Sequence, residues 1–253
     1  MVNATDSLNI SAGVLKPSVL RGLSFNCLAI ELSCSSQASR SAADCARLCC
    51  FVGGTPVHTN DGLRPIEGLR VQDLLLLQLE DGSSGADYGH MLRVVESGFQ
   101  KIFALYLMID DDLSKTETIF VTGAHLFGVR EKWVRADRLT VGMTVNVAND
   151  SSAMVCSRRL VQASATADIG WVQNLAYGNE ETEDGQFIDF TGATPRVIWA
   201  ADNNPVPNDA APLQGEDDGA LLRKTYDLEL ADAVAYHVGV HGVRVRGAPL
   251  GSV

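Results

Sequence analysis

The chain has 253 residues, 46% of them hydrophobic and 20% charged, a balance typical of a globular protein long enough to bury one large core or two small ones. Its 31 acidic residues outnumber 20 basic ones and give a formal net charge of −11. Because nucleic acids and anionic membranes bind basic faces, we expect neither as a partner. No window reaches the roughly 18 apolar residues of a membrane span, and the N-terminus lacks the basic cluster of a secretory signal, which favours a cytoplasmic location.

Residues 1–49 have the composition of a flank rather than of a folded core, because Ser, Ala and Asn interrupt their short apolar run. The segment 38–48 predicts a short amphipathic helix with alanines on one side. From residue 50 onward the sequence changes to apolar segments separated by turn signals, which predicts an all-β domain. Asn60-Asp61-Gly62 indicates a hairpin, and Asp110-Asp111-Asp112 an acidic turn. The segments expected to form strands are 56–59, 63–79, 93–108, 117–129, 133–147 and 225–246.

Residues 148–224 interrupt this pattern. They are rich in Asn, Asp, Gly, Ala and Pro, with apolar islands at 187–190 and 197–199, and residues 202–218 have the composition of an exposed, mobile loop. We therefore divide the chain into an N-terminal flank (1–49), a β domain (50–247) with a long insertion or variable region (about 148–224), and a C-terminal tail (248–253).

The β domain contains a repeat. Ile66–Asp73 and Ala136–Met143 align without a gap at an offset of 70 residues (66 to 136), and each follows a turn and begins an apolar strand. A repeat of this kind indicates two related β subdomains.

The cysteines gather ahead of the β domain and at its start. Five of the six fall within the first 50 residues, namely Cys27, Cys34, Cys45, Cys49 and Cys50, and Cys156 lies apart. An even number permits disulfides, but a chain of this length does not need them. Cys45-x3-Cys49 supplies half of a zinc motif without a second half nearby, so we expect no metal site. A redox or metal module built on these cysteines is kept as an alternative.

Two motifs of the β domain carry groups suited to chemistry. Cys50 opens the domain, and Thr122-Gly123-Ala124-His125 follows an apolar strand, so a hydroxyl and an imidazole project from a strand end and from the turn after it. A thiol suits acyl transfer because its thiolate attacks readily and the thioester that results stays reactive. Taken separately, Thr122 is interpreted as a strand residue and His125 as a hydrogen-bonded, half-buried histidine.

The order of the motifs narrows the interpretation. Cys-Phe-x-x-Gly-Thr-x-Val-x-Thr-x-x-Gly-x-x-x-Ile-Glu begins at Cys50, Val-Thr-x-x-His-x-Phe-x-Val begins at Val121, and Trp-Val-x-Ala-x-x-Leu-x-Val-Gly begins at Trp133. The chain then ends in Thr-Tyr-Asp-Leu-Glu-Leu from Thr225 and Val-Arg-Val from Val243. This combination resembles the Hint (Hedgehog/intein) superfamily of autoprocessing domains, particularly the bacterial Hint domains of large secreted polymorphic toxins. The resemblance covers about residues 50–247 and is weak across 148–224.

The resemblance implies the Hint fold, a horseshoe or disc of β-strands with a pseudo-twofold relation between subdomains, here with a short, partly helical N-terminal flank. It also implies single-turnover autoprocessing, in which Cys50 attacks the carbonyl of Cys49 and converts the Cys49–Cys50 peptide bond into a thioester by an N–S acyl shift. By this resemblance His125 donates a proton to the Cys50 nitrogen, Thr122 orients or polarises the scissile amide, and Asp227 assists. The alternative for Asp227 is a solvated strand carboxylate.

The partners that the resemblance implies are the chain's own flank as substrate and water or a small nucleophile that resolves the thioester, with no cofactor and no metal. Secretion within a toxin system is the alternative to a cytoplasmic location.

The C-terminal motif departs from the family. Splicing members end in Val-x-Val-His-Asn, and this chain reads Val243-Arg244-Val245-Arg246-Gly247, in which glycine has no side-chain amide to cyclise. The upstream His-Thr-Tyr reads Val234-Ala235-Tyr236, and His237 and His241 are interpreted as strand and turn residues. We therefore expect the C-terminal step to be lost and no splicing. A degenerate Hint fold acting as an inert or binding module is the main alternative.

Overall fold

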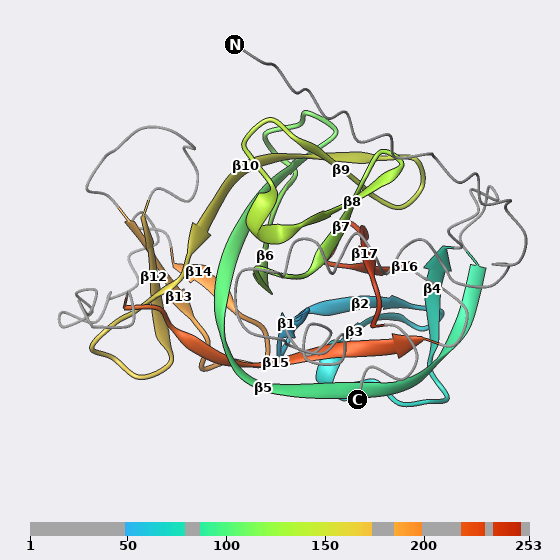
Figure 1. Cartoon of the computed structure of the whole chain (residues 1–253), viewed down its shortest axis with the longest axis horizontal. Helices are drawn as coiled ribbons and strands as arrows, with labels where there is room; N and C mark the ends of the chain where they lie inside the picture. Colours follow the sequence, from blue (N-terminus) through green and yellow to red (C-terminus); the bar gives the residue numbers. More distant parts are fainter. Residues whose placement is uncertain (1–48, 79–86, 174–184, 199–218, 231–234, 249–253) are drawn as a thin grey trace, which may run out of the picture. The chain divides into compact units, whose positions relative to one another are not determined.

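The computed structural model describes residues 49–78, 87–173, 185–198, 219–230 and 235–248 (Figure 1), which all fall within one unit of the chain, Arg40–Val253. These residues form strands and two short 3-10 helices, so the all-β prediction is confirmed. The predicted helix 38–48 and the predicted loop 202–218 lie outside the described residues. Within the described ranges no helix is long and apolar enough to cross a membrane.

The elements before residue 150 follow the predicted turns. They are β1 (Phe51–Val52), β2 (Pro56–Thr59), β3 (Gly62–Pro65), η1 (Ile66–Gly68), β4 (Leu74–Gln78), β5 (Asp87–Ile109), β6 (Thr116–Thr122), β7 (Leu126–Val129), β8 (Lys132–Arg135), η2 (Ala136–Arg138) and β9 (Thr144–Asn146). The later strands are β10 (Ser152–Leu160), β11 (Gln162–Ala163), β12 (Ile169–Gln173), β13 (Gly185–Asp189), β14 (Arg196–Ile198), β15 (Leu222–Leu230), β16 (Ala235–Val238) and β17 (Val243–Arg246).

The long strand β5 organises a 13-stranded sheet in which neighbours follow the order β15-β1-β6-β5-β4-β2-β16-β17-β7-β8. Its start pairs with β4, its middle with β15, and its end with β6 and β10, all antiparallel. In Figure 1 β5 is the green strand that curves along the bottom and up the left side. Because β15 pairs with both β5 and β1, the end of the domain closes onto its beginning.

The described part of 148–224 is folded. β10 belongs to the main sheet through β5 and β9, whereas β11, β12, β13 and β14 form a separate four-stranded sheet. This small sheet shares a buried apolar cluster with β1, β5 and β6. The cluster consists of Val52, Ile102, Ala104, Phe120, Val161, Val172, Ile188 and Phe190. The apolar islands of the sequence therefore build a layer against the main sheet.

The 70-residue repeat extends further in the structure than in the sequence. The hairpin β2–β3 closes between Thr59 and Gly62, as predicted, and β7–β8 closes 70 residues later between Val129 and Lys132. Each hairpin leads into a 3-10 helix, η1 or η2, and not directly into a strand. The reason is that the first residue of each helix is fully buried, which turns the chain into the core.

The backbone hydrogen bonds that precede these helices repeat as well. The Thr55 N–H donates to the Val52 carbonyl oxygen, and the Thr55 carbonyl oxygen accepts from the Ile66 N–H. Seventy residues later (55 to 125), His125 makes the same two bonds, with Thr122 and Ala136. His125 therefore occupies in the second copy the place that Thr55 occupies in the first.

Candidate functional site

Cys50 directly precedes β1, a strand of two residues that pairs with β6 on one side and with β15 on the other. The two antiparallel registers place Cys50 between Thr122, at the end of β6, and Asp227, in β15. Residues from three distant motifs thus meet where β1 begins. All four candidate residues, Cys50, Thr122, His125 and Asp227, are buried.

The Cys49–Cys50 peptide is fixed by β6 and by the turn that follows it. The Cys50 N–H donates to Thr122 Oγ1 at 2.8 Å, and the Thr122 N–H donates to the Cys50 carbonyl oxygen at 2.9 Å. The Cys49 thiol donates to the Ala124 carbonyl oxygen at 3.3 Å. The nitrogen of the predicted scissile bond is therefore hydrogen-bonded to the Thr122 hydroxyl.

His125 is fully buried beside this peptide. Its ring packs on Phe51 with centroids 4.1 Å apart and lies 5.9 Å from the ring of Phe127. Neither ring nitrogen has a hydrogen-bond partner among the described residues, although the Cys49 backbone is near enough to act on the imidazole. Burial lowers the pKa of His125 to about 3, and the Cys49 backbone opposes this shift. The interpretation as a half-buried histidine is wrong, because the side chain is 0% exposed.

The Cys50 thiol is fully buried. Burial raises its pKa to about 12, and the nearby carboxyl of Asp227 contributes in the same direction. The side chains of Ser97, Thr225 and Gln100 act the other way, and Gln100 Nε2 lies 3.9 Å from Cys50 Sγ. At neutral pH the resting side chain is therefore the thiol and not the thiolate.

Asp227 is 1% exposed, so its interpretation as a solvated strand carboxylate is wrong. Burial raises the pKa of its carboxyl well above the usual range, against the effect of hydrogen bonds from the Leu228 N–H and the Tyr236 hydroxyl. Together with Cys50 and His125, Asp227 makes a site that favours uncharged resting forms. Inside such a dry site, charge that develops during a reaction interacts strongly with its neighbours.

Sequence reasoning did not find Tyr236, Gln100, Ser97 and Thr225. Tyr236 is fully buried, and its hydroxyl donates to Asp227 Oδ1 at 3.1 Å. The sequence did contain a sign of Tyr236, because this residue matches the tyrosine of the family's His-Thr-Tyr motif. Thr225 begins the Thr-Tyr-Asp-Leu-Glu-Leu motif, in which only Asp227 was singled out, whereas Ser97 and Gln100 lie in β5 and belong to no motif.

The residues at the end of β17 are held against β15. The Ala248 N–H donates to the Leu228 carbonyl oxygen at 3.0 Å. A Cβ added at Gly247 would lie 2.8 Å from Leu230 Cδ1 and 3.1 Å from the Leu228 carbonyl oxygen. Position 247 therefore has room for glycine but not for a larger side chain without a shift of Leu230.

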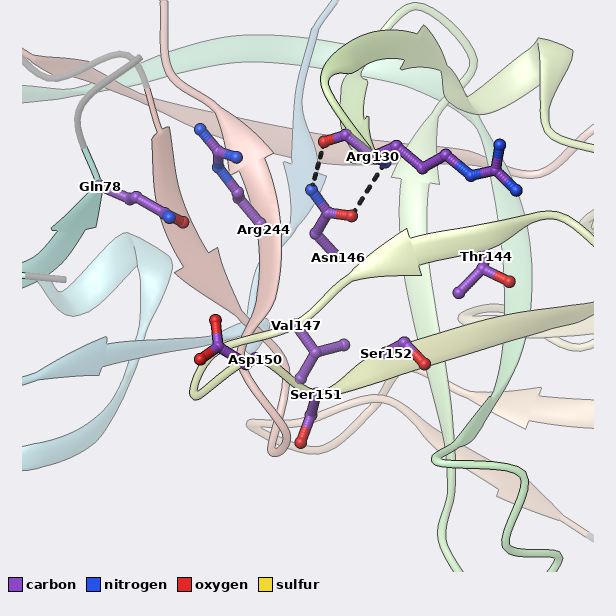
Figure 2. A pocket seen from close by; sticks show the side chains of 9 residues that line it. All are labelled: Gln78, Arg130, Thr144, Asn146, Val147, Asp150, Ser151, Ser152 and Arg244. Carbon is purple, nitrogen blue, oxygen red and sulfur yellow. Dashed lines mark hydrogen bonds between the residues drawn. The ribbon is translucent and has the colours of Figure 1, made fainter. Parts of the chain in front are cut away.

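A pocket of about 500 Å³ lies away from these residues (Figure 2). Asn146 lines it and bridges the backbone of Arg130, donating to its carbonyl oxygen at 2.7 Å and accepting from its N–H at 2.9 Å. Figure 2 shows the guanidinium groups of Arg130 and Arg244 pointing in different directions. They do not converge on one ligand position, and we assign no role to the pocket.

Comparisons with known proteins give similar solved structures. A bacterial intein-like domain from Clostridium thermocellum is 18% identical with a TM-score of 0.47, and the match covers 79% of this chain and 99% of that domain. A DnaB intein from Synechocystis is 10% identical with a TM-score of 0.46, covering 78% and 97%. The DnaX mini intein from Spirulina platensis is 13% identical with a TM-score of 0.41, covering 78% and 99%.

This chain is similar to intein and intein-like domains. These are the proteins whose motifs the sequence resembles. No family model matches the chain. No curated protein matches it. Because the identities and TM-scores are low, the proposals below rest on the residues of the site and their geometry.

Proposed function

We propose that the chain is a self-processing domain of the Hint type, which converts the Cys49–Cys50 peptide bond into a thioester and so releases the N-terminal flank 1–49. The proposal rests on the surroundings of the Cys49–Cys50 peptide bond. The nitrogen of this bond donates to Thr122 Oγ1 at 2.8 Å, and the buried side chains of Cys50, His125 and Asp227 surround it. The motif order further supports a toxin-type bacterial Hint domain, with 50–247 as the processing domain.

The acyl shift forms one bond, breaks one bond and moves two protons, and the residues of the site can take part in each step. The Cys50 sulfur bonds to the Cys49 carbonyl carbon, the carbon–nitrogen bond breaks, one proton leaves the sulfur and one reaches the nitrogen. In this proposal the ionised form of Asp227 accepts the thiol proton, and His125 delivers a proton to the departing nitrogen. Because the pKa of His125 is about 3, only about one imidazole in ten thousand is protonated at pH 7, which makes the first step slow in the resting site. Water or a small nucleophile then cleaves the thioester.

A second candidate is an inert or binding module with the same fold. The observation in its favour is the pKa of Cys50, raised to about 12, because a buried thiol of this kind is a weak nucleophile at rest. The two candidates differ in whether the Cys49–Cys50 bond breaks.

The first experiment tests the scissile bond. The purified full chain, incubated with dithiothreitol or hydroxylamine, is expected to release a fragment that ends at Cys49, detected by mass spectrometry of the intact protein. Cys50→Ala removes the nucleophile and is expected to abolish the fragment, whereas Cys156→Ala in β10 removes a thiol elsewhere and keeps it. An intact mass that stays unchanged in the unmodified chain contradicts self-processing and supports the inert module.

The proposal also predicts that restoring asparagine does not restore splicing. Gly247→Asn is expected to lower the free energy of unfolding by about 1 kcal/mol, because its Cβ must displace Leu230. No release of 248–253 is expected, because Arg246 and Val234 stand at the two sequence positions that carry the assisting histidines in the family motif. Urea denaturation measures the loss of stability, and mass spectrometry of the intact protein detects any release of 248–253. A C-terminal fragment would show that only the asparagine was missing.

A further inference from the structure

The two oxygens of the Asp227 carboxyl have different surroundings. Oδ1 accepts two hydrogen bonds, from the Leu228 N–H at 2.7 Å and from the Tyr236 hydroxyl at 3.1 Å. Oδ2 has no hydrogen-bond partner among the described residues, although the residue is only 1% exposed. A buried polar atom without a partner is costly and uncommon, and Asp227 is close enough to raise the pKa of the Cys50 thiol, so this oxygen calls for a role.

Tyr236 reaches Asp227 from a distant part of the sheet. It lies in β16, five strands away from β1 along the sheet order, and its ring meets that of Phe51 edge-on with centroids 6.4 Å apart. The hydrogen bond therefore crosses the core and is not part of a strand ladder. Since a buried tyrosine hydroxyl needs a partner, this contact fixes both the tyrosine and the carboxyl.

We propose that Tyr236 is a positioning residue for self-processing: its hydroxyl holds Oδ1 of Asp227 and leaves Oδ2 as the oxygen that takes the proton from the Cys50 thiol. The proposal rests on the self-processing function. As the bond from the sulfur to the Cys49 carbonyl carbon forms, the sulfur gives its proton to Oδ2. Tyr236 keeps its own proton throughout.

The hydroxyl also shifts the equilibrium of the Asp227 carboxyl toward its ionised form. An O–H that donates to a carboxylate favours the ionised form, so the Tyr236 hydroxyl lowers the pKa of Asp227 against the larger effect of burial. The described titratable groups that face Asp227 are Cys50, before β1, and Tyr236 itself, with Cys49 next to them. Without the hydroxyl, Asp227 stays protonated to a higher pH and cannot accept the thiol proton.

Tyr236→Phe tests this directly, because it keeps the ring and removes only the oxygen. We expect cleavage at Cys49–Cys50 to slow about tenfold, and its rise with pH to move up by about one unit. In the Asp227→Asn chain, adding Tyr236→Phe is expected to change nothing further, since the tyrosine acts through the carboxyl. Tyr106→Phe removes a hydroxyl outside the site and is expected to leave the rate unchanged. The proposal is overturned if Tyr236→Phe slows cleavage tenfold in the Asp227→Asn chain as well, or if it does not slow cleavage in the unmodified chain.

A second measurement does not depend on cleavage. In the full Cys50→Ala chain, the infrared band of the protonated Asp227 carboxyl, identified by its loss in Asp227→Asn, is followed against pH. Tyr236→Phe is expected to raise the pH midpoint of this titration by about one unit. An unchanged midpoint would show that the Tyr236 hydroxyl does not control the ionisation of Asp227. A chain that never cleaves contradicts self-processing instead, while the infrared midpoint still decides whether Tyr236 controls the carboxyl.

Discussion

His125→Met is expected to stabilise the fold and to slow cleavage at Cys49–Cys50 by about 10²- to 10⁴-fold, the contribution typical of a general acid. His125 is fully buried with neither ring nitrogen hydrogen-bonded to a described residue, and burial of such polar atoms costs about 1–3 kcal/mol. Methionine has a similar volume, adapts its shape and packs against aromatic rings such as Phe51. The free energy of unfolding at pH 7 should therefore rise by about 1–2 kcal/mol, measured by urea denaturation.

The same substitution should change the response to acid. Because the pKa of His125 falls from 6.5 to about 3 on folding, the unfolded chain binds more protons at this residue than the folded chain between those values. His125 therefore adds no pH-dependent penalty above pH 6.5, and it destabilises the folded chain increasingly as the pH falls toward 3, by an amount on the order of 4 kcal/mol. The His125→Met chain should lack this part of the loss, seen as a flatter curve of unfolding free energy against pH.

His58→Met is the matched control, because it makes the same exchange at a histidine that has a partner. His58 Nε2 lies 2.9 Å from the Gly239 carbonyl oxygen, so methionine removes a hydrogen bond and leaves that oxygen without it. We expect this variant to be less stable at pH 7, opposite in sign to His125→Met. If His125→Met also destabilises the chain while cleavage continues, His125 is a structural residue and not the proton donor.

Much of the fold could be predicted from local sequence. The turn at Asn60-Asp61-Gly62, the acidic turn at 110–112 and the hairpin around His241-Gly242 all follow from residues that favour particular backbone angles. The run 63–79 was taken as one apolar segment, and the structure divides its described part into β3, η1 and β4. The four-stranded sheet was missed because its strands are short islands within polar sequence, and they are stable only through burial against the main sheet.

The candidate site divides in the same way. Cys50, Thr122, His125 and Asp227 could be named from motifs, because the resemblance to the Hint superfamily assigns roles to those positions. The burial of His125 could not, since Phe51 and Phe127, which cover its ring, come from other strands. The contact of Tyr236 with Asp227 joins β16 to β15 across the core, and no sequence period reports such a contact.

Gly54→Ala is expected to cost about 2–4 kcal/mol of unfolding free energy, which is large for the addition of one methyl group. Gly54 has φ +81°, a conformation that costs other residues about 1 kcal/mol. A Cβ here would also overlap the Ala193 carbonyl oxygen and lie 2.8 Å from Thr194 Cα. These atoms are backbone of the turn between β13 and β14, so they cannot move as a side chain can.

This close approach connects the four-stranded sheet to the turn that follows the proposed nucleophile, Cys50. Gly54 follows Cys50 by four residues, and its N–H donates to Glu67 Oε2 at 2.7 Å, so the turn after β1 is held by Glu67 and by the β13–β14 turn. A shift of this turn moves Cys50 relative to the scissile carbonyl. Because misplacement of about 1 Å can cost about 10²-fold in rate, we expect Gly54→Ala to slow cleavage by roughly 10- to 100-fold.

Gly142→Ala separates the two contributions, because Gly142 has nearly the same φ, +85°, but a Cβ there meets no atom within 4 Å. It should lose only about 1 kcal/mol and cleave at the unmodified rate, measured by urea denaturation and by the yield of the fragment that ends at Cys49. The excess loss in Gly54→Ala then measures the contact with Ala193 and Thr194 alone. Equal losses in the two variants would mean that the β13–β14 turn yields freely, and that the four-stranded sheet lies beside the site without supporting it.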